Sequence, residues 1–518
     1  MQIDLTINKG FKWHQKKNVW AKGFLFDSNN IFYEEEKILD YFLGIKNKDD
    51  FEIKLKEANG FFCVLIQHED VVFVAVDSIR SHPLFYSEAY QWIGDYPDTL
   101  NETHVLKKDT ISKYEFFATG YVTGNQTIYE DIYQLQAGQY LIIENNTCRL
   151  HTYYQYLHQD FIDYTEEKAR IELDKCVTNA MERLITYAKG RQLVIPLSGG
   201  YDSRLIVLKL KELGYTNILC FSYGKLNNVE SLISKKVADH LGLKWVFIDY
   251  EPIVKLLYQS ENMTQYDHFS HRAVSLPHKQ DYFAVHQLKE KPLIEKNAIF
   301  IPGHTGDFLG GKHVPQKAYE SHWNKKQIIN QLLKQHYNLF KLTKKQKDIY
   351  FQKTTTILPS QPKLGDTSSQ LDHWNWRERQ AKFIVNSCRV YEFYGYQWYC
   401  PLWDKELMEY FKKLPIKFRK NKWLYNTYIN KQNVVLEIKE SKYKISLAIF
   451  FKQIIKTIIK KTKCLDFVMV FKGCLDMKLH LLCLDATLSV KEYIRLSLQG
   501  HRKINGIELF LFSQRSKK

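Results

Sequence analysis

The sequence has no Cys-x-x-Cys pair, although nine cysteines are scattered along its 518 residues. Neither a zinc site nor a thiol-redox centre is therefore expected. An odd number of cysteines in a chain of this length fits reduced thiols in a cytosol. Uninterrupted apolar runs of about 18 residues are also missing, so no membrane-spanning helix is predicted. Because the first residues lack the long apolar core of a signal peptide, we expect a cytoplasmic protein.

Acidic residues are outnumbered, with 57 Asp and Glu against 74 Lys and Arg and a formal net charge of +17. A basic balance can indicate nucleic acid, an anionic membrane surface or an anionic small molecule. Because the charge is spread along the chain, solvated Lys-rich faces explain it best, and no nucleic acid partner is expected. An aromatic content of 14% argues against disorder. The length favours two or three domains.

Residues 1–158 carry mainly strand patterns. Apolar runs at 61–66 and 71–76 flank a short polar stretch, which predicts a hairpin, and a second hairpin is predicted across residues 138–150. These patterns favour an α+β domain built on antiparallel sheets with helices.

Residues 165–435 change to alternating helices and strands. Thr165 can cap a first helix, and strands at 193–197, 217–222 and 244–248 are separated by helices at 203–213 and 229–241. This alternation predicts an α/β domain with a parallel sheet and helical additions. Ligands of such sheets bind at the carboxyl ends of the strands.

Residues 436–518 are expected to form a basic helical extension. Isoleucines and lysines are interleaved over 445–463. This pattern fits a helix on a membrane surface, which would give a peripheral membrane contact. It equally fits a surface helix that packs on its own domain, and we retain both interpretations.

Small and polar residues at 198–203 follow the first strand of the α/β domain. Two adjacent glycines let the backbone approach a ligand closely, and the next helix directs free amide groups to the same spot. Such a cradle suits the pyrophosphate of ATP. Asp202 would repel phosphate alone, but it fits if it holds a magnesium ion that bridges the phosphates. The predicted ATP-binding residues are Ser198, Gly199, Gly200, Tyr201, Asp202, Ser203, Ser222 and Gly303.

The segment 198–203 resembles the pyrophosphate loop of the N-type ATP pyrophosphatases, a family that includes asparagine synthetase and GMP synthetase. The resemblance implies an adenine nucleotide α-hydrolase-like domain. It also implies that a substrate oxygen attacks the α-phosphate of ATP, which yields an adenylate and pyrophosphate.

Further stretches resemble the asparagine synthetase branch of that family. Residues 303–311 resemble its second magnesium motif, which implies that Asp307 binds Mg²⁺ together with Asp202. The branch has glutamates where this chain has His304 and Phe308, which puts aspartate as the substrate in question. His304 either serves as a base near neutral pH or is structural.

Two more positions complete the predicted synthetase site. Residues 400–407 resemble a folding motif of the branch. Lys422 lies where the branch has a lysine that stabilises charge during adenylation, and Lys420 is a close competitor for that position.

The amino-terminal part resembles the class II glutamine amidotransferase domain of the same branch at residues 59–62, 77–86 and 138–141. That domain uses an amino-terminal cysteine as its nucleophile, whereas this chain has Gln2, and Cys63 lies inside a predicted strand. The resemblance therefore implies a degenerate domain, and ammonia from glutamine is not expected.

These observations favour an amide-forming ligase that takes ATP, a small carboxylate and an amine or ammonia. Genuine asparagine synthesis from aspartate is one alternative. A tRNA-modifying enzyme is another, although its thiolating members use cysteine pairs that this chain lacks. A non-catalytic nucleotide-binding scaffold is the third. The sequence names neither the acid nor the nitrogen donor, and it leaves the oligomeric state open.

Overall fold

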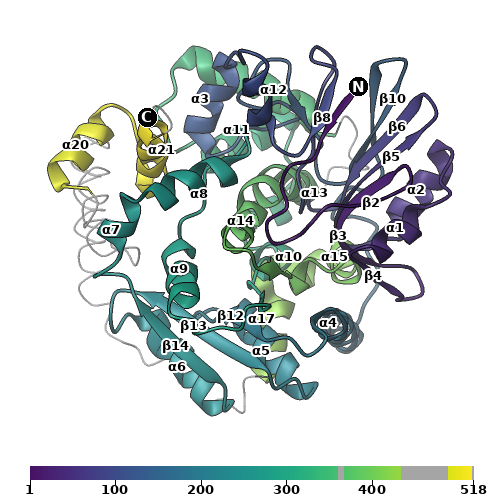
Figure 1. The fold of residues 1–518 in the computed structure, drawn as a ribbon. Coiled ribbons are helices and arrows are strands. Elements are labelled where there is room, and N and C mark those ends of the chain that lie inside the picture. The colour runs from purple at the N-terminus through teal and green to yellow at the C-terminus, as the bar shows by residue number, and fades with distance from the viewer. Residues whose placement is uncertain (360–366, 433–487, 516–518) are drawn as a thin grey trace.

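Two β-sheets face each other in the amino-terminal part of the chain (Figure 1). The computed structural model describes residues 1–359, 367–432 and 488–515. The larger sheet has the order β11-β10-β6-β5-β3-β2, with β4 paired to β3, and the smaller has the order β1-β8-β7-β9. The strands of the larger sheet are β2 (His14–Lys16), β3 (Val19–Phe26), β4 (Phe32–Glu34), β5 (Asn59–His68), β6 (Val71–Val76), β10 (Gln139–Glu144) and β11 (Thr147–Thr152). Those of the smaller are β1 (Gln2–Asp4), β7 (Phe85–Ser87), β8 (Trp92–Gly94) and β9 (Tyr133–Gln134).

The alternation of side chains along β5 builds the layers of this part. Successive side chains of a strand point to opposite faces. Cys63 and Leu65 face the smaller sheet, where they pack with Tyr86 and Ile93. Phe62 and Val64 face the other way, against helices α1 (Lys37–Phe42) and α2 (Lys48–Glu57). Both predicted hairpins are present, as the antiparallel pairs β5–β6 and β10–β11.

A five-stranded, wholly parallel sheet organises the second part of the chain. Its strands are β12 (Leu193–Pro196), β13 (Ile218–Gly224), β14 (Lys244–Asp249), β15 (Ile299–Phe300) and β16 (Gln397–Trp398). Their order is β14-β13-β12-β15-β16. Strands β13 and β14 therefore lie on one side of β12, and β15 and β16 lie on the other, which makes the gap between β12 and β15 a switch point in the strand order. Ligands of open parallel sheets bind at such a switch point, outside the carboxyl ends of the strands. The predicted fold class, α+β followed by α/β, is confirmed.

Helices α5 (Tyr201–Glu212) and α6 (Val229–His240) lie below the parallel sheet in Figure 1, and α9 (Tyr282–Glu290) lies above it. Helix α4 (Glu166–Ala188) precedes the sheet, and the Thr165 hydroxyl accepts a hydrogen bond from the Lys168 N–H, as a helix cap does. The remaining α-helices are α3 (Thr110–Thr119), α7 (Val254–Tyr258), α8 (Glu261–His271), α10 (Gly306–Leu309), α11 (Lys325–His336), α12 (Lys344–Ile357), α13 (Thr367–Trp374), α14 (Arg389–Phe393), α15 (Lys405–Lys413), α16 (Ile416–Arg419), α17 (Trp423–Gln432), α20 (Val490–Leu498) and α21 (Lys503–Arg515). Short 3₁₀ turns occur at η1 (Pro97–Glu102), η2 (Gln316–Tyr319), η4 (Val385–Cys388), η5 (Pro401–Trp403) and η6 (Lys420–Lys422), and η3 (Asn375–Ile384) is a π-helix.

Asp404 joins the two parts of the molecule. Its buried carboxylate accepts two hydrogen bonds from the Arg183 guanidinium, at 2.7 and 2.9 Å, and one from the Asn59 side chain at 3.1 Å. It also caps α15 by accepting from the Glu406 N–H. Because paired hydrogen bonds from a guanidinium fix a carboxylate in place, the segment 400–407 has a folding role.

Within the described ranges, no helix has the length and apolar content needed to cross a bilayer. The isoleucine- and lysine-rich stretch at 445–463, with its predicted surface helix, lies outside those ranges.

Candidate functional site

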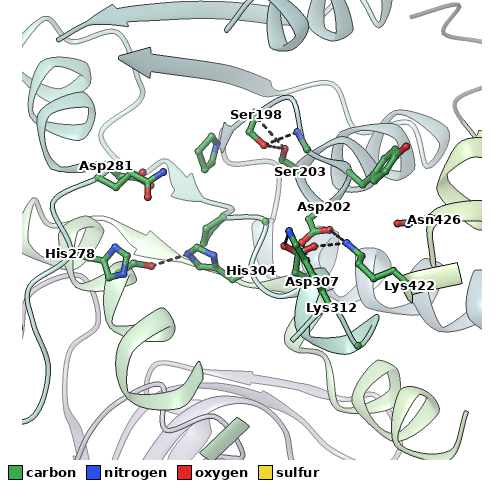
Figure 2. Close-up of a pocket in the computed structure, with 18 of the residues that line it drawn as sticks. Ser198, Asp202, Ser203, His278, Asp281, His304, Asp307, Lys312, Lys422 and Asn426 are labelled. Atoms are coloured by element: carbon green, nitrogen blue, oxygen red, sulfur yellow. Dashed lines mark hydrogen bonds and ion pairs between the residues drawn. The ribbon is translucent and has the colours of Figure 1, made fainter. Parts of the chain in front are cut away.

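A cavity of about 660 Å³ opens at the carboxyl ends of β12 and β15, at the switch point of the parallel sheet. Figure 2 shows two groups of side chains along it. Ser198, Ser203, Asp202, Asp307 and Lys422 gather toward one end, and His278, Asp281 and His304 toward the other. Residues more than 200 positions apart in the chain therefore meet in one site.

The segment 198–203 closes into a tight loop between β12 and α5. The Ser198 N–H donates to the Ser203 hydroxyl at 3.1 Å, and the Gly200 N–H donates to the Ser198 hydroxyl at the same distance. No side chain caps the start of α5, so the first amide groups of a twelve-residue helix face the cavity. Free amides at a helix start, with the positive end of its dipole, favour an anion.

Asp202 and Asp307 converge beside this loop. The Asp307 N–H donates to Asp202 Oδ2 at 3.1 Å, and the Tyr425 hydroxyl donates to Oδ1 at 2.9 Å. Burial raises the pKa of Asp202 to about 6, whereas Lys312 and Lys422 outweigh burial at Asp307 and lower its pKa. Two carboxylates on adjacent elements supply the oxygen ligands that Mg²⁺ prefers, and a divalent cation would favour the ionised form of both. The residues present fit the predicted metal.

Lys422 reaches the acid pair from the end of η6. Its ammonium group forms an ion pair with Asp307 Oδ1 and lies 4.0 Å from Asp202 Oδ1. The backbone of Asn421 and Lys422 is left-handed, with φ of 58° and 57°, which costs energy for residues with a side chain and is found often at functional sites. Lys420 points elsewhere and pairs with Glu320 at 2.6 Å near the surface. Of the two candidate lysines, Lys422 is the one that lines the cavity.

Gly306 allows the acid pair to pack closely. A methyl group at this position would overlap the Tyr425 hydroxyl and come within 2.5 Å of Asp202 Oδ1. We expect Gly306→Ala to displace Tyr425 from Asp202 and to destabilise the protein by about 1–3 kcal/mol, as overpacking does. The measurement is the free energy of unfolding in urea. The Tyr425→Phe change removes one of the overlapping atoms, so the double variant should recover part of the loss. Equal stability of Gly306→Ala and the unchanged protein would contradict this packing.

His304 lies in the wall of the cavity farther from the acid pair (Figure 2). Its Nε2 is 2.8 Å from the Ser387 hydroxyl, which itself donates to the Ile384 carbonyl at 2.7 Å. Because that hydroxyl proton is already used, Ser387 accepts from His304 Nε2–H, and His304 Nδ1 is left as an unprotonated acceptor. Burial lowers the pKa of His304, only partly opposed by Asp281, which favours this neutral form.

Two predicted residues lie apart from the cavity wall, and several lining residues were not predicted. Ser222 is buried within β13, where its neighbour Tyr223 lines the cavity instead. The Gly199 carbonyl accepts from the Arg204 guanidinium at 2.8 Å. Lys312 follows Gly310 and Gly311 directly, so the motif at 303–311 could have indicated it. The other unpredicted polar lining residues are His278, Gln280, Asp281, Ser387, Asn421 and Asn426, which carry no motif.

The two thiols of the amino-terminal part are poor nucleophiles. Cys63 is fully buried in β5, and burial raises its pKa well above the usual range. Burial and the Glu88 carboxylate raise the pKa of Cys148 to about 12. A thiol is nucleophilic as its thiolate, so neither side chain is poised for covalent chemistry.

Comparisons with known proteins match part of the chain. Residues 52–154 match the family described as a glutamine amidotransferase domain. A probable glutamine-hydrolysing asparagine synthetase of Acanthamoeba polyphaga mimivirus is 28% identical over 42% of this chain and 40% of that protein. A putative glutamine-hydrolysing asparagine synthetase of Methanocaldococcus jannaschii is 25% identical over 35% of this chain and 37% of that protein. The chain thus spans about two-fifths of the length of the curated relatives it matches.

Among solved structures, an ammonia-dependent NAD synthetase of Campylobacter jejuni overlaps 29% of this chain and 61% of its own, at 19% identity and a TM-score of 0.20. A Burkholderia pseudomallei NAD⁺ synthetase overlaps 45% of this chain and 93% of its own, at 14% identity and a TM-score of 0.19. Scores this low carry no weight for function.

The parallel sheet, with its loop and helix start at the switch point, gives the second part of the chain an α/β fold of the kind that binds anionic ligands at the carboxyl ends of its strands. More narrowly, part of the chain is similar to glutamine-hydrolysing asparagine synthetases, and residues 52–154 resemble a glutamine amidotransferase domain.

Proposed function

We propose that this protein is an ATP-dependent amide-forming ligase that activates a carboxylate as its adenylate. The observation that carries the proposal is the meeting of an uncapped helix start, two converging carboxylates and the Lys422 ammonium group in one cavity. This set of groups is suited to bind a nucleoside triphosphate, because it combines amide donors for phosphate oxygens with ligands for a bridging cation.

Each step has residues suited to it. The amides and hydroxyls of residues 198–203 bind the β- and γ-phosphates, and Lys422 offsets charge that develops as a carboxylate oxygen attacks the α-phosphorus. The bond from that phosphorus to the bridging oxygen breaks, and pyrophosphate leaves. An amine nitrogen then attacks the acyl carbon, AMP leaves, and His304 Nδ1 takes the proton that the amine gives up.

Asp202 and Asp307 would hold Mg²⁺, which would supply charge neutralisation between the phosphate groups. Lys312 and Lys422 both pair with Asp307 and keep its carboxylate ionised and in place.

Exchange of labelled pyrophosphate into ATP tests the proposal. The full-length protein, with Mg²⁺ and a panel of small carboxylic acids that includes aspartate, should exchange label only when the right acid is present. Exchange that is specific to aspartate would favour asparagine synthesis. Tight ATP binding without exchange for any acid on a broad panel would contradict an adenylating ligase.

Metal removal gives a second test. We expect EDTA to suppress the exchange by at least about a thousandfold, since the phosphate charges would lose their bridging cation. Added Mg²⁺ should restore it, and the far-ultraviolet circular dichroism should not change between the two states. Exchange that persists after chelation and dialysis would count against the acid pair as a metal site.

We further propose that the nitrogen comes from a free amine or ammonia. The protonated state of Cys63 and Cys148 supports this source, because neither thiol can readily attack glutamine. Ammonium or an amine should therefore sustain product formation. Glutamine as the sole donor should not, and equal product yield from glutamine would overturn this part of the proposal.

A further inference from the structure

The segment 278–281 forms part of the cavity wall without being part of a helix or a strand. It lies between the end of α8 and the start of α9, and three of its side chains line the cavity, those of His278, Gln280 and Asp281. Side chains on a loop are placed precisely only where a rigid scaffold holds the loop. The fourth side chain, that of Lys279, is buried in the protein instead. The partner of Lys279 therefore helps to decide how firmly this wall is held.

The partner of Lys279 comes from the C-terminal helix α21. The Lys279 ammonium group donates to Glu508 Oε2 at 3.1 Å, and the Tyr258 hydroxyl donates to the same oxygen at 2.7 Å. Asp267 Oδ1 lies 3.5 Å from the ammonium group. The side chains of Lys279, Asp267 and Glu508 are 5%, 3% and 11% exposed. Because removing one partner of a buried ion pair leaves the other charge uncompensated, Glu508 is a strong anchor for Lys279.

Helix α21 makes a second contact with the same stretch of chain. Glu508 and Phe512 are four residues apart, so their side chains share one face of the helix, and both are buried. The Phe512 ring packs on the ring of His271, the last residue of α8, with centroids 5.6 Å apart. Figure 1 shows α21 beside α8. One face of α21 thus holds both ends of the stretch 271–279.

The backbone between these two contacts contains a strained turn. Arg272 and Ala273 have φ of 46° and 55°, in the left-handed region that costs energy for residues with a side chain. Such a turn persists only where the surrounding structure determines it. The Arg272 guanidinium donates to the Phe269 carbonyl at 2.7 Å and to the Asp95 carbonyl at 2.8 Å. The contacts of α21 on both sides of the turn add to this support.

We propose that Glu508 is a positioning residue: by holding Lys279, it lets the C-terminal helix α21 fix the segment 278–281 in the cavity wall. The consequence for catalysis rests on the proposed adenylating function of the same cavity. The loop at 198–203 lies toward the other end of the cavity and has hydrogen bonds of its own (Figure 2). Loss of the anchor should therefore disturb one wall and leave the phosphate-binding loop in place.

Amide hydrogen exchange, read by mass spectrometry, tests the anchor without relying on catalysis. The Tyr282 N–H donates to the Lys279 carbonyl at 3.2 Å, so release of Lys279 should expose this amide. A peptide that spans 278–284 should exchange about 10- to 100-fold faster in Glu508→Ala, the scale of a lost charged hydrogen bond. A peptide that spans 198–205 should not change. Glu508→Gln should lie near the unchanged protein, because its amide oxygen can still accept from both donors.

Two further variants separate the anchor from a general loss of stability. Lys279→Met removes the same ion pair from its other side and should reproduce the faster amide exchange. Asp174→Asn is the matched control, because Asp174 also accepts from a lysine and a tyrosine, Lys209 at 2.6 Å and Tyr428 at 2.7 Å. Asp174 lies outside the cavity, so this variant should leave the exchange at 278–284 unchanged. Melting temperatures report whether each variant folds.

Pyrophosphate exchange gives the catalytic readout. Glu508→Ala should lower the maximal rate by about 10- to 100-fold, as the displacement of positioned groups does. The half-saturating ATP concentration should stay within about twofold, since the phosphate-binding loop is not disturbed. Glu508→Gln should recover most of the rate.

Amide exchange at 278–284 that is unchanged in Glu508→Ala, or equally faster in Asp174→Asn, would overturn the assignment. A maximal rate in Glu508→Ala equal to that of the unchanged protein would overturn it as well. Faster amide exchange in Glu508→Ala, together with no pyrophosphate exchange by the unchanged protein, would instead overturn only the proposed function.

Discussion

Replacing Asp202 with asparagine should reduce acid-dependent pyrophosphate exchange by on the order of a thousandfold, the scale seen when a preorganised electrostatic contact is lost. The physical reason is the loss of one of two converging carboxylates that would hold a cation between phosphate groups. The local fold should survive the change. An asparagine carbonyl can still accept from the Asp307 N–H, and its amide can donate to the Tyr425 hydroxyl, so both contacts of Asp202 have an equivalent.

The measurement is the exchange rate as a function of Mg²⁺ concentration. Asp239→Asn is a suitable control, because Asp239 sits on the exposed face of α6 in an ion pair with Lys235 and takes no part in the cavity. Excess Mg²⁺ should recover little of the rate in Asp202→Asn. A variant that keeps its exchange within tenfold of the unchanged protein would remove the metal role of Asp202. If Asp202→Asn also left the protein's biological output in cells unchanged, a non-catalytic nucleotide-binding scaffold would become the better description.

The loop at 198–203 was predictable because its chemistry is local. Two glycines, two serines and an aspartate between a strand and a helix specify both the backbone path and the donors, and the strand and helix are adjacent in the sequence. The hairpins β5–β6 and β10–β11 were predictable for the same reason, since short apolar runs flank short polar turns.

The far end of the cavity could not be predicted, because its residues are brought together by long-range packing. Tyr223 lies near the end of β13, Asp281 precedes α9, and Ser387 lies in η4, and each looks like an ordinary polar residue in its own segment. The Tyr223 hydroxyl donates to Asp281 Oδ1 at 2.6 Å, a contact that no local pattern encodes. Strands β15 and β16 were missed for a related reason, since two residues are too few to show a period.

The π-helical geometry of η3 could not be predicted from its own sequence either. Its sequence, 375–384, mixes polar and apolar residues as an ordinary helix does, and no residue pattern in it predicts π-helical geometry. Buried polar partners across the molecule, such as the Gln136 side chain and the Val122 and Gly124 carbonyls, give the helix its contacts.

Lys422→Met should lower the rate of adenylation by about 100- to 1,000-fold, with most of the loss in kcat. A charge that acts as the transition state forms contributes to kcat, whereas one that binds ATP uniformly would change KM alone. Lys422 is well placed for the first role, because its side chain is only 10% exposed and its ammonium group lies against both carboxylates. Methionine keeps the length of the buried aliphatic stem, so the variant should fold.

Substitutions of the neighbouring lysines should lower the adenylation rate less than Lys422→Met does, in a predictable order. Lys312 also pairs with Asp307, at 2.6 Å, but its side chain is 59% exposed, so water screens its charge and Lys312→Met should lose only about tenfold. Lys420 pairs with Glu320 outside the cavity, and Lys420→Met should change the rate less than about twofold, as expected for an exposed ion pair. Single-turnover rates of pyrophosphate release at saturating ATP give all three values. A larger effect at Lys420 than at Lys422 would reassign the catalytic lysine, and equal effects at all three would indicate that only the net charge of the cavity mouth matters.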